Sequence, residues 1–227
     1  MTKKNELIKG DAAGQSGLSS GISWTSELKR SRQSGPSQVH KDWSDVGFST
    51  AAVQAGTTDD PISGAVGTPI YQTTTFLLDD DQYRSVEEGY ARDRFIYTRY
   101  GNPNQWALQT KLAALEGAEA AVATSSGMAA ILSTCMALLK AGDHVVCSRS
   151  VFGTTTVLFN KFMSKFGVEV TFVSPVDLAQ WSQALEPNTR MLFLETPSNP
   201  LSEVADIAAI SAVAKAHDCL FVVDNCF

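Results

Sequence analysis

Short apolar runs and amphipathic helical stretches alternate from Ala120 to the end of this 227-residue chain. The runs are continuously apolar, as in strands of a parallel sheet that is covered on both faces. Predicted strands occupy residues 121–124, 144–147, 168–173, 191–195 and 219–223, and predicted helices occupy 128–140, 154–166, 177–185 and 205–217. Alternation at this spacing predicts an α/β fold with a mostly parallel sheet and right-handed crossovers. The loops after the strands are where such a sheet builds its ligand site.

Composition argues against several classes of protein. The net charge is −6, and no basic face indicates a nucleic-acid partner. The sequence contains no run of about 18 apolar residues, so it predicts no membrane span. The beginning of the chain lacks a secretory signal, so we expect a cytoplasmic protein. The cysteines and histidines do not show the spacing of a metal site. Residues 1–46 are polar and weakly periodic, which predicts a mobile extension.

The segment Ser125–Ala130 follows a predicted strand and opens a predicted helix. Gly127 lacks a side chain, so a ligand can approach its backbone closely. The first N–H groups of a helix have no partner within the helix and attract phosphate. The alternative is that Ser126 simply caps an ordinary helix.

Asp224 and Asn199 follow two other predicted strands. A carboxylate at a strand end can pair with the ring nitrogen of a heteroaromatic cofactor, and the alternative is a turn or capping aspartate. Asn199 lies between Pro197 and Pro200, which stiffen the loop around its amide. The alternative for Asn199 is a structural loop amide.

Two further segments carry an arginine and aromatic residues. In the segment 97–103, Arg99 can grip a phosphate and Tyr97 can donate another hydrogen bond. The alternative is a surface loop in which Arg99 stacks on a tyrosine. Phe152 follows the strand 144–147, where it either lies against a planar ligand ring or packs in the core.

Taken together, the stretches YTRYGNP, ATSSGMAA, SRSVFGTTT, LETPSNP and VVDN resemble the Cys/Met-metabolism (transsulfuration) enzymes that use pyridoxal 5′-phosphate (PLP). The resemblance runs from about Phe48 to Phe227. It implies the fold-type-I PLP-dependent transferase-like fold, with 106–227 as the first part of an incomplete PLP-binding domain. It also implies that residues 47–105 form an arm that contributes to a neighbouring subunit of a homo-oligomer, a dimer of dimers.

The resemblance implies cofactor contacts for seven residues: Tyr97, Arg99, Gly127, Met128, Phe152, Asn199 and Asp224. The N–H groups of Gly127 and Met128 would hold the phosphate, and Asp224 would pair with the pyridinium nitrogen. Phe152 would stack on the ring, and Asn199 would touch the ring hydroxyl or the substrate carboxylate.

By the same resemblance, Tyr97 and Arg99 would reach the phosphate bound by the neighbouring subunit. The Schiff-base lysine of the family follows the position of Asp224, and none of the ten lysines here has that setting. We therefore expect an N-terminal fragment that contains no catalytic lysine.

Many members of the family have tyrosine where Phe152 stands, and phenylalanine cannot carry a proton. The form SVFGTT resembles the O-succinylhomoserine sulfhydrylase branch. The expected activity is replacement of the acyl group of an acyl-homoserine by sulfide, which makes homocysteine in methionine biosynthesis. Cystathionine γ-synthesis with cysteine and cystathionine lysis are the alternatives, and a catalytically inert fragment is an alternative of another kind.

Overall fold

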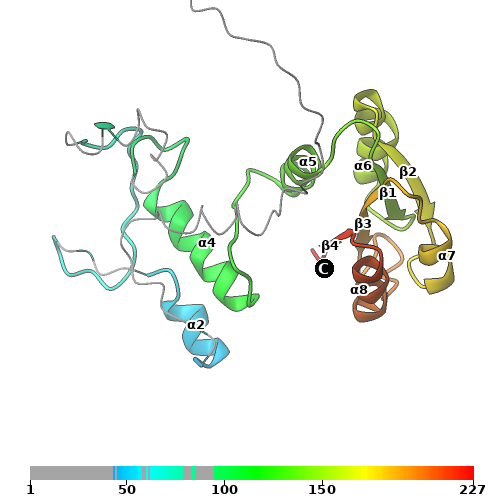
Figure 1. Ribbon diagram of the computed structural model, residues 1–227. Helices are drawn as coiled ribbons and strands as arrows, with labels where there is room; N and C mark the ends of the chain where they lie inside the picture. Colours follow the sequence, from blue (N-terminus) through cyan, green and yellow to red (C-terminus); the bar gives the residue numbers. More distant parts are fainter. Residues whose placement is uncertain (1–42, 44, 58–59, 61, 79–82, 85–94) are drawn as a thin grey trace, which may run out of the picture. The chain divides into compact units, whose positions relative to one another are not determined.

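The computed structural model describes residues 43, 45–57, 60, 62–78, 83–84 and 95–227 (Figure 1). The chain divides into two compact units between Ala121 and Val122. The predicted extension 1–46 lies almost wholly outside the described residues. The helices are α2 (Phe48–Gln54), α4 (Pro103–Leu115), α5 (Gly127–Leu138), α6 (Gly153–Val157), η3 (Leu158–Phe162), η4 (Met163–Phe166), α7 (Leu178–Gln183) and α8 (Ile207–Ala216). The strands are β1 (His144–Ser148), β2 (Glu169–Val173), β3 (Thr189–Glu195) and β4 (Leu220–Asp224).

In the first unit, α2 packs against α4. Helix α4 begins at Pro103, whose fixed φ suits the first turn, and Asn102 caps it by accepting a hydrogen bond from the Asn104 N–H at 2.9 Å. Gly56 follows α2 with a φ of +72°, and a β-carbon there would lie 2.1 Å from the carbonyl oxygen of Ala107. Only glycine therefore permits this close approach of the two segments.

Hydrogen bonds join two segments of the first unit that are distant in sequence. Thr75 and Tyr97 form an antiparallel bridge, and the Thr98 N–H donates to the Thr74 carbonyl at 2.8 Å. The Asn104 side chain accepts from the Tyr71 N–H at 2.8 Å and donates to the Pro69 carbonyl at 2.7 Å. The bridge and the Thr98 bond fix the backbone that carries Tyr97.

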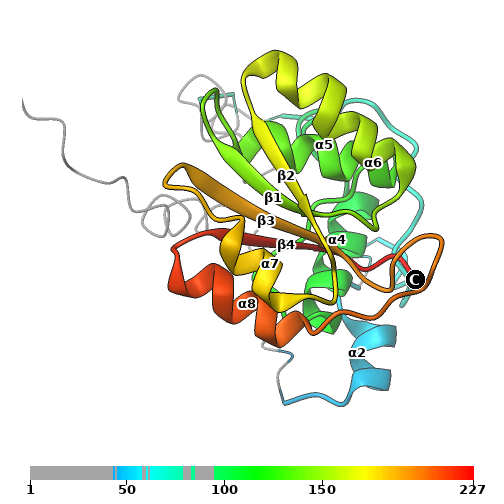
Figure 2. The same ribbon diagram turned by 90° about the vertical axis from the view of Figure 1, so that its right-hand side faces the viewer.

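The second unit is built on a four-stranded parallel sheet with the order β2-β1-β3-β4 (Figure 2). All five residues of β1 are buried, as expected for a central strand of a sheet that is covered on both faces. Helices α5 and α6 lie on one face, and α7 and α8 lie on the other (Figure 2). This confirms the predicted α/β fold.

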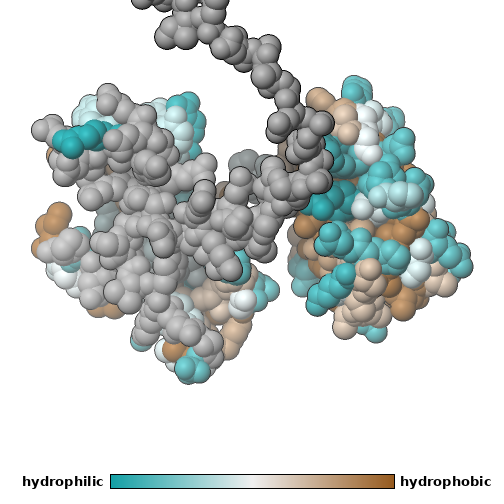
Figure 3. Space-filling model, viewed as in Figure 1, coloured by the Kyte–Doolittle hydropathy of each residue, from teal (hydrophilic) through white to brown (hydrophobic). Residues whose placement is uncertain are grey.

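Each face of the sheet has its own core. On the α5 and α6 face the core is formed by Cys135, Val145, Cys147, Val151, Leu158, Phe159, Met163, Val168, Met191 and Phe193. On the α7 and α8 face it is formed by Val146, Val173, Trp181, Leu192, Leu194, Ala205, Ile210 and Ala214. The surface of this unit mixes hydrophilic and apolar patches (Figure 3), and the exposed apolar side chains include Val176 and Leu178.

Two predictions of secondary structure are wrong. Residues 121–124 form no strand, and Val122 is 82% exposed, whereas the strands of this sheet are mostly covered. The alanines of this run have little preference for strands, which explains the difference. The single helix predicted for 154–166 is divided into α6, a π-helical turn (η3) and a 3₁₀ turn (η4). Packing favours this division, because Phe159 is fully buried with its ring 5.4 Å from that of Phe193.

Candidate functional site

The carboxyl ends of all four strands lie at one edge of the sheet, because the strands are parallel. Side chains alternate between the two faces along a strand. Phe193 packs in the core on the α5 and α6 face with Val222 beside it, so Glu195 and Asp224, two residues further on, project to the same face. Glu195 and Asp224 are also register partners on neighbouring strands.

The Glu195 carboxylate lies at the centre of this edge and is only 3% exposed. Its Oε2 accepts a hydrogen bond from the Phe152 N–H at 2.7 Å, and the Asn199 N–H also favours the charged carboxylate. Burial raises the pKa of Glu195 above its ordinary value, and the negative charge of Asp224 adds to the rise. The two N–H donors act in the opposite direction without cancelling it. Glu195 is not among the residues for which the sequence predicts a role.

The N-terminus of α5 belongs to this face of the unit. Ser126 caps α5 by accepting the Ala129 N–H at 3.1 Å, as one of the two sequence interpretations predicted. The helix offers no partner for the N–H groups of Gly127 and Met128. Apart from its chain neighbours and the backbone of its own helix, no described residue has an atom within 4 Å of where a Gly127 β-carbon would stand, so the backbone is accessible there. The Met128 sulfur accepts from the Thr155 hydroxyl of α6 at 3.8 Å.

Phe152 and Asn199 approach the same edge from two loops. Phe152 is 46% exposed at the start of α6, so the alternative that it packs in the core is wrong. Asn199 is half-buried, and its loop includes two cis peptide bonds, Thr196–Pro197 and Asn199–Pro200. Four of the predicted elements, namely α5, the β1 loop, the β3 loop and the end of β4, thus meet at one edge.

Hydrogen bonds attach the β3 loop to β4. The Thr196 N–H donates to the Asp224 carbonyl at 3.0 Å, and the Asn225 side-chain amide donates to the Thr196 carbonyl. Glu203, at the end of the same loop, accepts from the Ser150 hydroxyl at 2.7 Å. The loops after β1, β3 and β4 are therefore connected to one another around Glu195.

Tyr97 and Arg99 lie in the first unit. The Arg99 guanidinium stands 5.2 Å from the centre of the Tyr97 ring and 5.3 Å from that of Tyr100. This stacking is the arrangement that the surface-loop interpretation predicted. It also holds the guanidinium beside the Tyr97 side chain.

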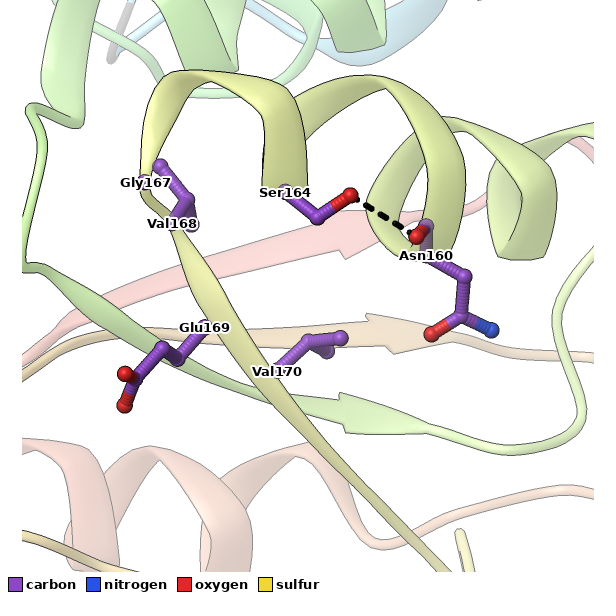
Figure 4. A pocket seen from close by; sticks show the side chains of 6 residues that line it. All are labelled: Asn160, Ser164, Gly167, Val168, Glu169 and Val170. Carbon is purple, nitrogen blue, oxygen red and sulfur yellow. Dashed lines mark hydrogen bonds between the residues drawn. The ribbon is translucent and has the colours of Figure 1, made fainter.

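Other parts of the molecule are less suited to chemistry. An open cavity of about 430 Å³ lies between η3, η4 and the beginning of β2 (Figure 4), and its lining includes Asn160, Ser164 and Glu169. Glu169 is the first residue of β2, so this cavity is at the opposite end of the strand from the carboxyl edge. Within the described ranges, no group of acidic, His and Cys side chains could hold a metal ion. No helix of the described chain has the length and apolarity to cross a membrane.

Comparison with known proteins identifies the family. The sequence model of the Cys/Met metabolism PLP-dependent enzymes matches residues 49–227. The chain belongs to this family. The match begins one residue from the point where the sequence resemblance was expected to begin. PLP is the cofactor of the Cys/Met metabolism family, and its members are enzymes.

Relatives with several activities are similar to this chain. An O-succinylhomoserine sulfhydrylase of Pseudomonas aeruginosa is 43% identical over 84% of this chain and 47% of its own length. An L-methionine γ-lyase of Fusobacterium nucleatum is 43% identical over 80% of this chain and 46% of its own. A probable cystathionine γ-synthase of Herpetosiphon aurantiacus is 44% identical over 81% of this chain and 54% of its own length. The chain spans about half the length of these curated relatives.

Solved structures of the family share the fold. The metB protein of Corynebacterium glutamicum matches with a TM-score of 0.74 at 37% identity, over 82% of this chain and 46% of that one. The metY protein of Campylobacter jejuni was solved with a pyridoxyl-lysine phosphate. It matches with a TM-score of 0.74 at 29% identity, over 79% of this chain and 44% of that one. The expected fold-type-I PLP-dependent transferase-like fold is therefore confirmed.

Proposed function

We propose that the carboxyl edge of the second unit forms the PLP site of a sulfur amino-acid enzyme. The observation that carries the proposal is the meeting of α5, Phe152, Asn199 and Asp224 at one edge and on one face of the sheet. The chemistry of these groups matches the cofactor, since a phosphate needs N–H donors, a pyridinium needs a carboxylate and a flat ring needs an aromatic neighbour.

Each group has a defined task in this proposal. The N–H groups of Gly127 and Met128 bind the phosphate, which the open space beside Gly127 admits. The Asp224 carboxylate holds a proton on the ring nitrogen, and Phe152 covers one face of the ring. Asn199 donates to the ring hydroxyl or to the substrate carboxylate. When bound, PLP supplies the electron sink that stabilises a substrate carbanion.

For the whole enzyme, we propose replacement of the acyl group of an acyl-homoserine by sulfide, which yields homocysteine. The similarity to the P. aeruginosa sulfhydrylase supports this reaction, and so does Phe152, which cannot carry a proton as tyrosine can. None of the lysines of this chain is assigned as the Schiff-base residue. The 227-residue chain alone is therefore expected to bind PLP without forming that bond and to be inactive.

A second candidate is supported by the other relatives. The Herpetosiphon protein favours cystathionine synthesis, in which cysteine replaces sulfide as the nucleophile. The Fusobacterium lyase is as similar to this chain as the sulfhydrylase is, which supports an elimination reaction. In either case the same residues would hold the cofactor. The two replacement reactions differ in their nucleophile, and elimination adds no nucleophile after the γ-group leaves.

We also propose that Tyr97 and Arg99 act on a neighbouring subunit's cofactor in a homo-oligomer. Their pairing supports this, because one hydroxyl and one guanidinium held side by side make a phosphate clamp. Replacing Arg99 with lysine would keep the charge but lose the forked geometry.

The substitution Phe152→Tyr in the whole enzyme tests the reaction. We expect elimination from the acyl-homoserine to rise by up to about 100-fold, the lower end of what a positioned proton carrier contributes, while sulfide replacement changes little. Homocysteine and the 2-oxo acid formed by elimination are measured in the same reaction mixture. Phe152→Leu is the control, since it adds no hydroxyl. An enzyme that eliminates without sulfide and never forms homocysteine would refute the sulfhydrylase proposal.

A further inference from the structure

Glu195 is a buried carboxylate for which the proposed function has no use. It ends β3, is 3% exposed, and accepts the Phe152 N–H at 2.7 Å, while the Asn199 N–H lies so that it favours the charged carboxylate. Those two residues carry the ring-stacking and hydroxyl-binding side chains of the proposed site. One carboxylate thus bonds to the Phe152 loop and interacts with a backbone N–H of the Asn199 loop, and the side chains of both loops would contact the cofactor.

A carboxylate suits this position better than an amide. A carboxylate has two acceptor oxygens, one for each of the two N–H groups. A glutamine side chain has one acceptor oxygen and one NH₂ group, and the NH₂ group would place a donor opposite the second N–H donor. An unpaired buried N–H is costly, so a glutamine would hold only one of the two loops well.

The charge of Glu195 also faces the site. Its register partner is Asp224, and the titratable groups near it are Asp224, the buried Cys147 thiol and the exposed Cys226 thiol. No cation among them neutralises the two carboxylates. Two negative charges side by side favour a cationic ligand group at this edge, and a protonated ring nitrogen is such a group.

We propose that Glu195 is a positioning residue that holds Phe152 and Asn199 in place and, beside Asp224, strengthens the binding of a protonated ring. The proposal rests on the proposed function, because it requires a cofactor at this edge. It adds a residue that never touches the cofactor and acts through two backbone N–H groups and a charge.

The hydrogen bonds can be tested on the chain without any ligand. In the ¹⁵N-labelled chain, the amide signals of Phe152 and Asn199 should shift together as Glu195 titrates, at a pH above the ordinary glutamate range. The shared titration should vanish in Glu195→Gln and persist in Glu203→Gln. The Glu203 control alters a carboxylate of the same loop that accepts a hydroxyl, a bond that glutamine can also make. Amide signals that do not titrate in the unaltered chain would overturn the proposal.

The charge is tested with pyridoxine 5′-phosphate, which has no aldehyde and binds only non-covalently. We expect Glu195→Gln to bind it about tenfold more weakly than the unaltered chain at about pH 8, as for loss of a charged hydrogen-bond acceptor. The ratio should fall toward one as the pH is lowered, because Glu195 in the unaltered chain then gains a proton and becomes neutral as well. Because the ligand titrates identically in both experiments, the ratio isolates Glu195.

The outcomes separate the two proposals. Equal affinity of the unaltered chain and Glu195→Gln at both pH values would overturn the role of Glu195 and leave the cofactor site intact. If Glu203→Gln also bound pyridoxine 5′-phosphate tenfold more weakly, the effect would be a general one of the loop. That result would also overturn the role of Glu195. Absence of binding by the unaltered chain would refute the proposed function and this role together.

Discussion

Replacing Gly56 with alanine should loosen the packing of α2 on α4. Two costs add at this position. A φ of +72° in a residue with a side chain costs about 1 kcal/mol or more. A β-carbon 2.1 Å from the Ala107 carbonyl oxygen overlaps backbone that has no rotamer to adopt, which adds about 2 kcal/mol, a typical cost of overpacking. The expected loss is therefore roughly 3 kcal/mol.

Gly117 provides the matched control. It also has a positive φ, +61°, but apart from its chain neighbours no described residue has an atom within 4 Å of its hypothetical β-carbon. Gly117→Ala should therefore cost only the conformational part, about 1 kcal/mol. The difference of about 2 kcal/mol corresponds to roughly 30-fold faster amide exchange, at 1.36 kcal/mol for each factor of ten.

Hydrogen exchange followed by mass spectrometry measures this difference locally. The peptide that contains α4 should exchange about 30-fold faster in Gly56→Ala than in Gly117→Ala. The peptide of β1, which belongs to the other unit, should be unchanged in both variants. Equal exchange of α4 in the two variants would show that the close approach at Ala107 costs nothing, and the steric argument would be refuted.

Two further predictions concern the second unit. Ser126→Ala should destabilise the second unit by about 1 kcal/mol in urea unfolding, because the Ala129 N–H loses its partner. Ser126→Asp should keep the stability, since aspartate can also cap the helix. Equal loss in both variants would contradict the capping role. Burial raises the pKa of Cys135 to about 11 and that of Cys147 well above the ordinary value, so both thiols stay protonated near pH 8. Iodoacetamide should then modify exposed Cys226 first, at a rate that increases with pH. If peptide mapping of the native chain finds Cys135 modified as fast as Cys226, the protection of Cys135 by burial is contradicted.

The sequence predicted the sheet well because its strands are short apolar runs between clear helix signals. Asp177 caps α7 and Gly167 ends the helical segment before β2 with a φ of +75°, as their residue types indicate. Residues 121–124 were misassigned because apolar character alone does not make a strand. The irregular turn at 158–162 was missed because it depends on how Phe159 packs, which no local pattern encodes.

The site could be predicted only in part, because strand ends are visible in the sequence and contacts between loops are not. Strand ends reveal which residues reach the carboxyl edge, so Phe152, Asn199 and Asp224 could be placed there from the sequence. The importance of Glu195 depends on backbone N–H groups from two separate loops, and these contacts exist only in the folded unit. One signal was available: the runs LFLE and FVVD each end an apolar strand with an acidic residue.

The strand order has a consequence for how this chain is synthesised. β1 pairs with β2 on one side, but its other neighbour, β3, begins 45 residues later, at Thr189 opposite His144. At roughly 5–20 residues per second, the ribosome takes about 2–9 s to add that length. During this interval β1, whose five residues are all buried in the folded unit, has at least one open edge in a nascent polypeptide. This is the period in which a chaperone that binds extended segments would protect it from aggregation.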